Sequence, residues 1–145
     1  MGWVMPFDKI YPFTMKWEGW DKITDDPDDP GGLTKFGLSK KANPDLDIAS
    51  ITLADARDIY KARYWRPVAT GANDLLDMAA FDTAVNCGAS RVRTWLLRCS
   101  TYSDMLDRRL EHYEDIIARN PKLAKYRKGW KNRVVALRKF LEGMK

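Results

Sequence analysis

Histidine and cysteine are the scarcest reactive residues of this chain. Its 145 residues include one histidine, His112, and two cysteines, Cys87 and Cys99. The chain has no Cys-x-x-Cys pair and no His/Cys cluster, which argues against a zinc site. A serine or cysteine nucleophile that depends on histidine would have only His112 as its base, and that residue lies between Glu111 and Glu114. We therefore interpret His112 as a solvated surface residue, and we expect no metal and no cofactor.

Long apolar runs are missing as well, which bears on the compartment. The N-terminal stretch MGWVMPFDKIYPF lacks the basic start and the unbroken apolar run of a secretory signal peptide. No apolar segment approaches the roughly 20 residues that a helix needs to span a bilayer. One disulfide between Cys87 and Cys99 is formally possible, but two free thiols in a reducing compartment are the favoured state. We expect synthesis in the cytoplasm, and release by another factor if the protein acts elsewhere.

The composition is that of a packed, basic, single domain. Hydrophobic residues make up 45% and aromatic residues 12% of the chain, which is enough to bury a core. The formal net charge of +5 draws a protein to polyanions such as nucleic acid, anionic membrane or bacterial cell wall. Charge alone does not choose among these three. A phosphate-binding glycine loop is missing, because Gly31-Gly32 is not followed by Gly-Lys-Ser/Thr.

Helical spacing of apolar residues dominates the chain, so we expect a mostly α (α+β) fold. A first helix is predicted to run to about Trp17, with Gly19 ending it and Glu18 at its C-terminal edge. The segment from Thr52 to Asp55 predicts a capping box, and residues 74–86 are apolar on nearly every side, as in a buried central helix. Further helices are predicted between that capping box and Pro67, over residues 91–99, from Ser103 to Asn120-Pro121, and over a last segment with Trp130, Val134, Leu137 and Leu141 inward.

The helical period breaks over residues 21–39, where we expect a small β-hairpin. Asp29-Pro30-Gly31-Gly32 has proline and glycine where a tight turn needs a fixed φ and a positive φ. Short strands are predicted around residues 22–24 and 33–37. Ser39 is predicted to cap a short helix that ends before Asn43-Pro44.

Carboxylates are the chemistry that this hairpin region offers. Cleavage of a glycosidic bond needs one protonated carboxyl and a second group that steadies positive charge or directs water. An apolar pocket raises the pKa of a glutamate, because burial disfavours the charged form. Glu18, with Trp17 and Trp20 beside it and Phe13 about a turn back, fits such an acid. The spacing alone is equally compatible with a helix-end carboxylate and a solvated acidic turn. The candidates for the second group are Asp25, Asp26, Asp28 and Asp29.

The motif E-G-W, followed by DDPDDPGGLTKFGLS, resembles the signature of glycoside hydrolase family 108. That signature is roughly E-G-G, a short acidic insert and D-P-G-G-x-T-x-x-G-I. The resemblance continues through DLDIASITLADARDIYKARYWRP to FDTAVNCG and GWKNRV, in the expected order. The family comprises phage endolysins and secretion-associated muramidases with a lysozyme-like fold. The last two motifs look like parts of the peptidoglycan-binding region that usually follows the catalytic motif.

The resemblance implies a role for each matching residue. Glu18 matches the catalytic glutamate and would be the general acid. Asp29 matches the aspartate before Pro-Gly-Gly, and neighbouring Asp28 stays an alternative for its role. Thr34 matches the threonine that follows, whose hydroxyl would help to hold the attacking water. Trp20 replaces the second glycine of E-G-G, so it is expected to narrow the cleft, to stack on a sugar or to shift the hairpin.

Two polar residues, Asp82 and Asn86, lie one turn apart on the predicted buried helix. Buried polar groups need hydrogen-bond partners, so we expect Asp82 to join a structural network under the hairpin. Asn86 either joins that network or reaches the cleft and contacts an N-acetyl group of the substrate. Tyr60, Tyr64 and Trp65 are expected in the core, with a sugar site as the alternative.

The last segment, residues 122–145, is strongly basic, and Glu142 is its only acidic residue. A solvated helix face would explain it, but we favour attraction to anionic wall or outer-membrane phosphates, which salt would weaken. A nucleic-acid-binding helical domain is a rival interpretation, although the DDPDD segment would repel phosphate. A wall-binding module without catalysis is a third. The basic residues are Lys122, Lys125, Arg127, Lys128, Lys131, Arg133, Arg138, Lys139 and Lys145.

These features together predict one lysozyme-like domain over residues 1–145. Residues 1–70 would hold the acid and the hairpin, and residues 74–145 a helical region that resembles a peptidoglycan-binding segment. The resemblance implies a peptidoglycan hydrolase, an endolysin of the N-acetylmuramidase type that cleaves between N-acetylmuramic acid and N-acetylglucosamine. A lytic transglycosylase is the alternative, and retention or inversion of the anomeric configuration stays open.

The resemblance also predicts partners and location. We expect a monomer that binds bacterial peptidoglycan and no nucleic acid. As a phage endolysin it would wait in the host cytoplasm until a holin opens the membrane, and would then act in the periplasm or cell wall.

Overall fold

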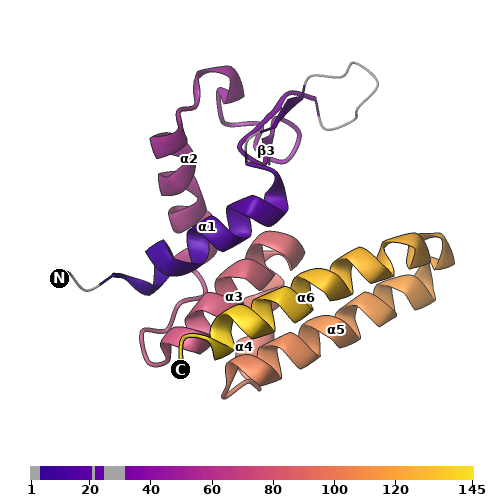
Figure 1. The fold of residues 1–145 in the computed structure, drawn as a ribbon. Coiled ribbons are helices and arrows are strands. Elements are labelled where there is room, and N and C mark those ends of the chain that lie inside the picture. Colours follow the sequence, from indigo (N-terminus) through magenta and orange to yellow (C-terminus); the bar gives the residue numbers. More distant parts are fainter. Residues whose placement is uncertain (1–3, 21, 25–31) are drawn as a thin grey trace.

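The computed structural model describes residues 4–20, 22–24 and 32–145, which form a mostly helical fold with one small sheet (Figure 1). The mostly α fold with a β element near the N-terminus, predicted from the sequence, is confirmed. The elements are α1 (Pro6–Glu18), β1 (Ile23–Thr24), β2 (Thr34–Lys35), β3 (Leu38–Ser39), the 3₁₀ turn η1 (Ile48–Ser50), α2 (Leu53–Tyr60), the π-helical turn η2 (Lys61–Trp65), α3 (Asp74–Cys87), α4 (Ala89–Leu96), α5 (Tyr102–Arg119), the 3₁₀ turn η3 (Pro121–Tyr126) and α6 (Arg127–Glu142).

Helix α3 is the centre of the core. Figure 1 shows α1, the sheet and α2 on one side of the molecule and the long helices α5 and α6 side by side on the other, with α3 between them. Every side chain of α3 from Leu76 to Ala84 is buried, as the all-round apolar sequence predicts. The Phe81 ring packs edge-on against Phe7 and Trp65, with centroid distances of 5.3 and 6.1 Å.

Helix α1 ends where the sequence predicts. Gly19 has a left-handed φ of 70°, which glycine adopts without steric cost, and its N–H donates to the Met15 carbonyl. The N–H of Trp20 donates to the same carbonyl at 3.1 Å. This reversal makes Glu18 the last helical residue and directs the chain toward β1.

The three strands form an antiparallel sheet in the order β1-β2-β3. Thr24 pairs with Thr34, and Thr34 pairs with Ser39. A turn at Phe36 and Gly37, with φ of 54° and 78°, joins β2 to β3. The first two strands lie where the sequence predicts them, whereas the third strand was not expected.

The short helix predicted to start at Ser39 is wrong. Ser39 belongs to β3, and its hydroxyl accepts the N–H of Ala42 at 3.2 Å in a turn. The N–H of Asn43 donates to the Ser39 carbonyl at 3.0 Å. The physical reason is the burial of Leu38, which β3 directs into the core beside its partner Lys35 in β2.

The capping box predicted at the start of α2 is confirmed. The N–H of Asp55 donates to the Thr52 hydroxyl at 3.1 Å, and the N–H of Thr52 donates to the Asp55 carboxylate at 3.0 Å. The helix predicted to reach Pro67 changes to a π-helical turn after Tyr60. Helices α4, α5 and α6 lie close to their predicted positions.

The structure also describes the two cysteines, the histidine and the apolar length of the helices. Cys87 and Cys99 are both half-buried free thiols. His112 is half-buried rather than fully solvated, because its ring packs edge-on against Trp95 at 5.2 Å. Burial, followed by the charges of nearby arginines, lowers the pKa of His112. Within the described ranges, none of the helices is long and apolar enough to cross a membrane.

Candidate active site

Glu18, at the end of α1, contacts an arginine from the other end of the chain. Its side chain is 24% exposed, and Nη1 of Arg133 in α6 donates to its Oε2 at 2.6 Å. The surroundings differ from the expected apolar pocket. Trp17 and Trp20 are 41% and 42% exposed, and the Phe13 ring packs on an aromatic ring of α6 with centroids 5.1 Å apart. The group that contacts the Glu18 carboxylate is therefore charged rather than apolar.

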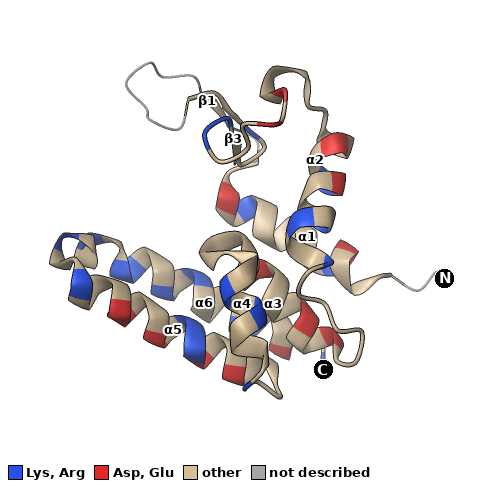
Figure 2. Ribbon diagram, turned by 180° about the vertical axis from the view of Figure 1, so that it is seen from behind, with Lys and Arg blue, Asp and Glu red and all other residues tan. Residues whose placement is uncertain are grey.

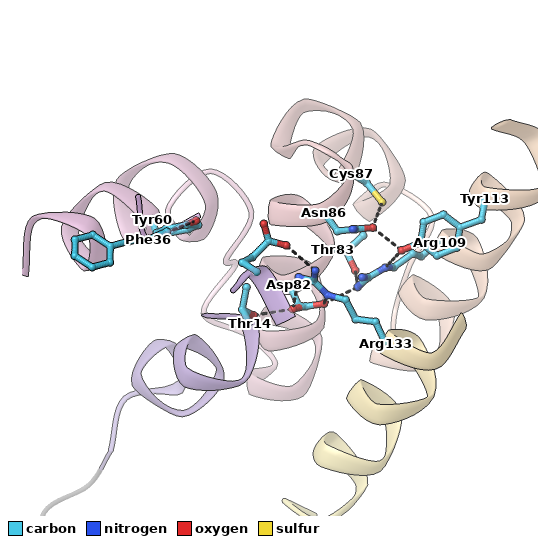
Figure 3. A network of polar contacts seen from close by, with 11 residues as sticks. Thr14, Phe36, Tyr60, Asp82, Thr83, Asn86, Cys87, Arg109, Tyr113 and Arg133 are labelled. Carbon is cyan, nitrogen blue, oxygen red and sulfur yellow. Dashed lines mark hydrogen bonds and ion pairs between the residues drawn. The ribbon is translucent and has the colours of Figure 1, made fainter. Parts of the chain in front are cut away.

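The turn between β2 and β3 packs directly on Glu18. A Cβ atom at Gly37 would lie 3.3 Å from Cβ of Glu18 and 2.5 Å from the hydroxyl oxygen of Tyr60. That hydroxyl donates to the Phe36 carbonyl at 3.0 Å (Figure 3). Burial, and then the nearby charge of Glu18, raise the pKa of Tyr60, so its phenol stays a donor. Gly37 is the final glycine of the D-P-G-G-x-T-x-x-G pattern, and the structure gives it a physical role that the sequence did not reveal.

We expect Gly37→Ala to reduce activity by about 100-fold, the order found when an active-site group moves by about 1 Å. Alanine at a φ of 78° is strained by roughly 1–2 kcal/mol, and its methyl group would push the turn away from Glu18 and Tyr60. Gly71→Ala is the matched control, since Gly71 also has a φ of 78° but nothing lies within 4 Å of its added Cβ. The unfolding free energies of both variants are measured as well. If these are equal and both variants lose the same activity, the close approach of Gly37 to Glu18 and Tyr60 has no special role.

Arg133, the partner of Glu18, also belongs to a buried cluster around Asp82 of α3 (Figure 3). Arg133 donates from Nε and Nη2 to the two Asp82 oxygens, at 3.2 and 2.9 Å. Arg109 of α5 donates from Nη1 to Oδ2 of Asp82 at 2.8 Å, and the hydroxyl of Thr14 donates to Oδ1 at 2.7 Å. The side chains of Asp82 and Arg109 are 0% exposed. The structural network predicted for Asp82 is therefore confirmed, and it joins four helices.

The arginines keep Asp82 ionised. Burial alone would raise the pKa of Asp82, but the attraction of Arg133 and then of Arg109, with their hydrogen bonds, outweighs it and lowers this pKa to about 2. For Arg133, burial opposes the charged form, while Asp82 and then Glu18 favour it and raise its pKa. Asp82 thus supplies a permanent negative charge beside both guanidinium groups at neutral pH.

The place of Arg133 corrects the sequence analysis, which counted it among the surface charges of the last helix. Its side chain is 7% exposed and faces Asp82 and Glu18. The spacing of apolar residues on α6 indicates the inward position of Arg133. Arg133 precedes the buried Val134 and lies four residues before the buried Leu137, on the inward side of the helix.

Asn86 joins the same region at the end of α3. Its amide oxygen accepts from the hydroxyl of Tyr113 and, at 3.3 Å, from the thiol of Cys87 (Figure 3). Tyr113 in turn accepts from Nε of Arg109 at 2.7 Å. Of the two predicted roles, the network role therefore has direct contacts. Only the amide NH₂ group of Asn86 would be left to contact a substrate.

The remaining predicted site residues lie in and beside the hairpin. Thr34 is half-buried in β2, and its hydroxyl donates to the Gly32 carbonyl at 3.4 Å. Trp20 borders an apolar pocket of about 460 Å³ between α1, the β2–β3 turn and α2. Asp28 and Asp29 lie outside the described residues, so their roles stay predictions.

The aromatic residues near α2 divide between core and site. Tyr60 is buried, and Trp65 packs on Phe7 and Phe81, as predicted for core residues. Tyr64 is half-buried in η2, and burial, opposed by Arg63, raises its pKa with a further contribution from Glu18. A π-helical turn often marks a functional site. A sugar site at Tyr64 therefore stays a prediction.

The basic character of the last segment is partly neutralised in three dimensions. Arg127 pairs with Glu114 at 2.9 Å, and Arg138 pairs with Asp107 at 3.1 Å. Figure 2 shows acidic residues along the ribbon of α5 beside the basic residues of α6. In sequence only Glu142 opposes this segment, whereas in the fold the acidic residues of α5 lie against α6 as well. Exposed lysines remain on η3 and α6: Lys122, Lys125, Lys128, Lys131 and Lys139.

Within the described part of the chain, no group of three or more His, Cys, Asp or Glu side chains is arranged to hold a metal ion. The site offers a carboxyl, Glu18, which a buried ion network supports and the β2–β3 turn approaches. This arrangement suits proton transfer to a leaving group.

No curated protein matches the chain. Among solved structures, the "Structure of Brucella abortus SagA" is similar, with a TM-score of 0.70 and 22% identity over 94% of each chain. At this identity the likeness shows the fold alone, and it supports the lysozyme-like helical fold over nearly the whole chain. The model of the family described as "Glycosyl hydrolase 108" matches residues 11–88, more than half of the chain, including Glu18 and the hairpin. The chain therefore belongs to glycosyl hydrolase family 108.

Proposed function

We propose that this glycoside hydrolase cleaves the peptidoglycan bond between N-acetylmuramic acid and N-acetylglucosamine, with Glu18 as the general acid. The observation that carries the proposal is the placement of Glu18. It ends α1 within the family-matched segment, its side chain is partly exposed, one oxygen is anchored by Arg133, and the β2–β3 turn packs on its Cβ. A positioned carboxyl of this kind can deliver a proton to the glycosidic oxygen.

The second group of the reaction would come from the hairpin. Asp29, with Asp28 as the alternative, would steady the oxocarbenium-like transition state or direct water, and the Thr34 hydroxyl would help to hold that water. The support is the match of these positions to the family pattern, together with the half-buried place of Thr34 in β2. A separation of about 5 Å between the carboxyls would indicate retention, and roughly 6.5–9.5 Å inversion.

Binding of the wall would use residues around the acid and the far end of α6. Trp20 and Tyr64 offer aromatic surfaces, and the Asn86 NH₂ group is a donor for an N-acetyl carbonyl. The exposed lysines of η3 and α6 would attract anionic wall polymers, an attraction that salt weakens. We expect a monomer without affinity for nucleic acid, which acts on the wall after release from the cytoplasm, like the phage endolysins that it resembles.

Mass spectrometry of the muropeptides that the purified protein releases from bacterial sacculi tests the proposed function. We expect products with reducing N-acetylmuramic acid ends, because hydrolysis adds water at that anomeric carbon. Anhydro ends would identify a lytic transglycosylase, and reducing N-acetylglucosamine ends a different bond. Binding to sacculi without released products would indicate a wall-binding module, and all three of these outcomes would overturn the proposal.

A further inference from the structure

Arg133 lies outside the family-matched residues 11–88, yet it contacts the catalytic glutamate of that segment. We propose that Arg133 is a positioning residue for the reaction: it fixes the Glu18 carboxyl through Oε2, so that Oε1 carries the proton given to the glycosidic oxygen. This inference rests on the proposed function, because it assigns a role to a residue that acts through Glu18.

Three hydrogen bonds fix the orientation of the Arg133 guanidinium. Two of its nitrogens, Nε and Nη2, donate to the two oxygens of Asp82, and Nη1 donates to Glu18. A guanidinium is planar and delocalised, so engaging three of its donors fixes the direction of each. Because Arg133 is held by the buried Asp82, the position of Oε2 of Glu18 is set from the core.

Helix α1 is attached to this cluster at two points. Thr14 donates to Asp82, and Glu18 accepts from Arg133. The two residues are four apart and therefore lie on one face of the helix. The cluster thus fixes the rotation of α1 about its axis as well as the side chain of Glu18, and it does so from α3 and α6.

The cluster also balances charge. Arg109 and Arg133 carry two positive charges, Asp82 carries one negative charge, and the Glu18 carboxylate supplies the second. When Glu18 gives up its proton, the C–O bond breaks and its electrons stay with the leaving oxygen, which takes that proton. Water then adds at the anomeric carbon, and its proton passes to a carboxylate of the site. Arg133 stabilises the carboxylate that this step produces, so its contact strengthens as the proton moves.

Other titratable groups also lie near Glu18. Tyr60 and Tyr64 lie close enough for its charge to raise their pKa values, and Lys22 lies against neighbouring Gly19. The hairpin aspartates at 25, 26, 28 and 29 lie outside the described residues. Both tyrosines stay neutral through the acid range, so Arg133 is the described permanent charge in direct contact with Glu18.

Replacement of Arg133 by methionine tests the inference. The Asp82–Arg109 pair and the Thr14 contact remain in this variant, so no buried charge is left alone and folding is expected. On solubilised glycan strands we expect kcat to fall by about 10- to 100-fold with little change in KM. The loss should fall on kcat, because Glu18 keeps its place at the end of α1 but no longer holds Oε1 toward the glycosidic oxygen.

Two further variants separate positioning from folding. Arg133→Lys keeps the charge but cannot reach Asp82 and Glu18 together, so kcat should still fall. Arg138→Met removes a partly exposed arginine of the same helix, which contacts Ser103 and Asp107, and should leave kcat and KM unchanged. A folded Arg133→Met protein with wild-type kcat, or with a loss in KM alone, would overturn the inference.

A readout without substrate keeps this test separate from the proposed function. At one fixed pH, the ¹³C NMR signal of the Glu18 side-chain carboxyl should differ between Arg133→Met and the wild type, because the hydrogen bond from Nη1 to Oε2 is lost, and should be unchanged in Arg138→Met. Equal signals in Arg133→Met and the wild type would overturn the inference whether or not hydrolysis is seen. If Arg133→Met did not fold, the kcat of folded Arg133→Lys would decide, with a wild-type value counting against the inference. Absence of muropeptides from the wild type would overturn the proposed function alone.

Discussion

Glu18→Gln is expected to lose muropeptide release by about 10²- to 10⁴-fold, the range that one general acid contributes. Glutamine has nearly the size of glutamate, and its amide oxygen can still accept the hydrogen bond from Nη1 of Arg133. It has no acidic proton to give to the glycosidic oxygen. The loss should therefore appear in kcat, measured as the clearing of sacculus suspensions and as released muropeptides.

Glu142→Gln is the matched control for this experiment. Glu142 is the last residue of α6 and is exposed, so the same chemical change there should leave the clearing rate unaltered. Thermal unfolding of both variants would show that the native fold persists. Full-rate clearing of sacculi by Glu18→Gln would remove Glu18 from the mechanism and with it the proposed general acid.

Asp82→Asn is expected to lower the free energy of unfolding by about 3–5 kcal/mol, the usual effect of removing one partner of a buried ion pair. The substitution leaves Arg109, which is 0% exposed, without its carboxylate, and leaves Arg133 with Glu18 alone. Domains of this size have about 5–15 kcal/mol of stability, so the variant should fold but unfold at much lower urea concentration.

Two comparisons make this second prediction specific. Asp107→Asn removes the exposed partner of Arg138 and should change stability by less than about 1 kcal/mol. The pKa of Asp82 is about 2 in the folded state, against 3.8 for an aspartate without these contacts. Acid is therefore expected to destabilise the protein. Its contribution of roughly 2 kcal/mol is present above pH 4 and is lost as the pH falls from about 4 to 2. A wild type and an Asp82→Asn variant with the same stability at pH 7 would contradict the assignment.

Local signals in the sequence predict the elements that carry the site. Gly19 ends α1 and so places Glu18 at its edge, and the Thr52–Asp55 capping box starts α2. The unbroken apolar run of α3 predicts its central position. Each of these outcomes depends on residues within one or two turns of chain, where propensity and capping act directly.

The contacts of Glu18 depend on residues far away in sequence, and no local signal predicts them. Glu18 and Arg133 are 115 residues apart, and Arg133 reads as one more surface cation until α6 is packed against α3. The apolar pocket that Trp17 and Trp20 were expected to form around Glu18 is wrong for a similar reason. Residues that are neighbours in sequence at a helix end point in different directions. Gly37 appears in the family pattern, but its contact with Tyr60 requires the sheet and α2 to be in place.

The tie between Arg133 and Glu18 has a consequence for modularity. A fragment that stops at residue 88 retains the catalytic signature but lacks Arg109, Tyr113 and Arg133, which satisfy Asp82 and Asn86. Exchange of the carboxyl-terminal helices between members of the family would therefore also replace the arginine that contacts Glu18. Chimaeras of these enzymes should keep the arginine-bearing helix with the glutamate that it supports.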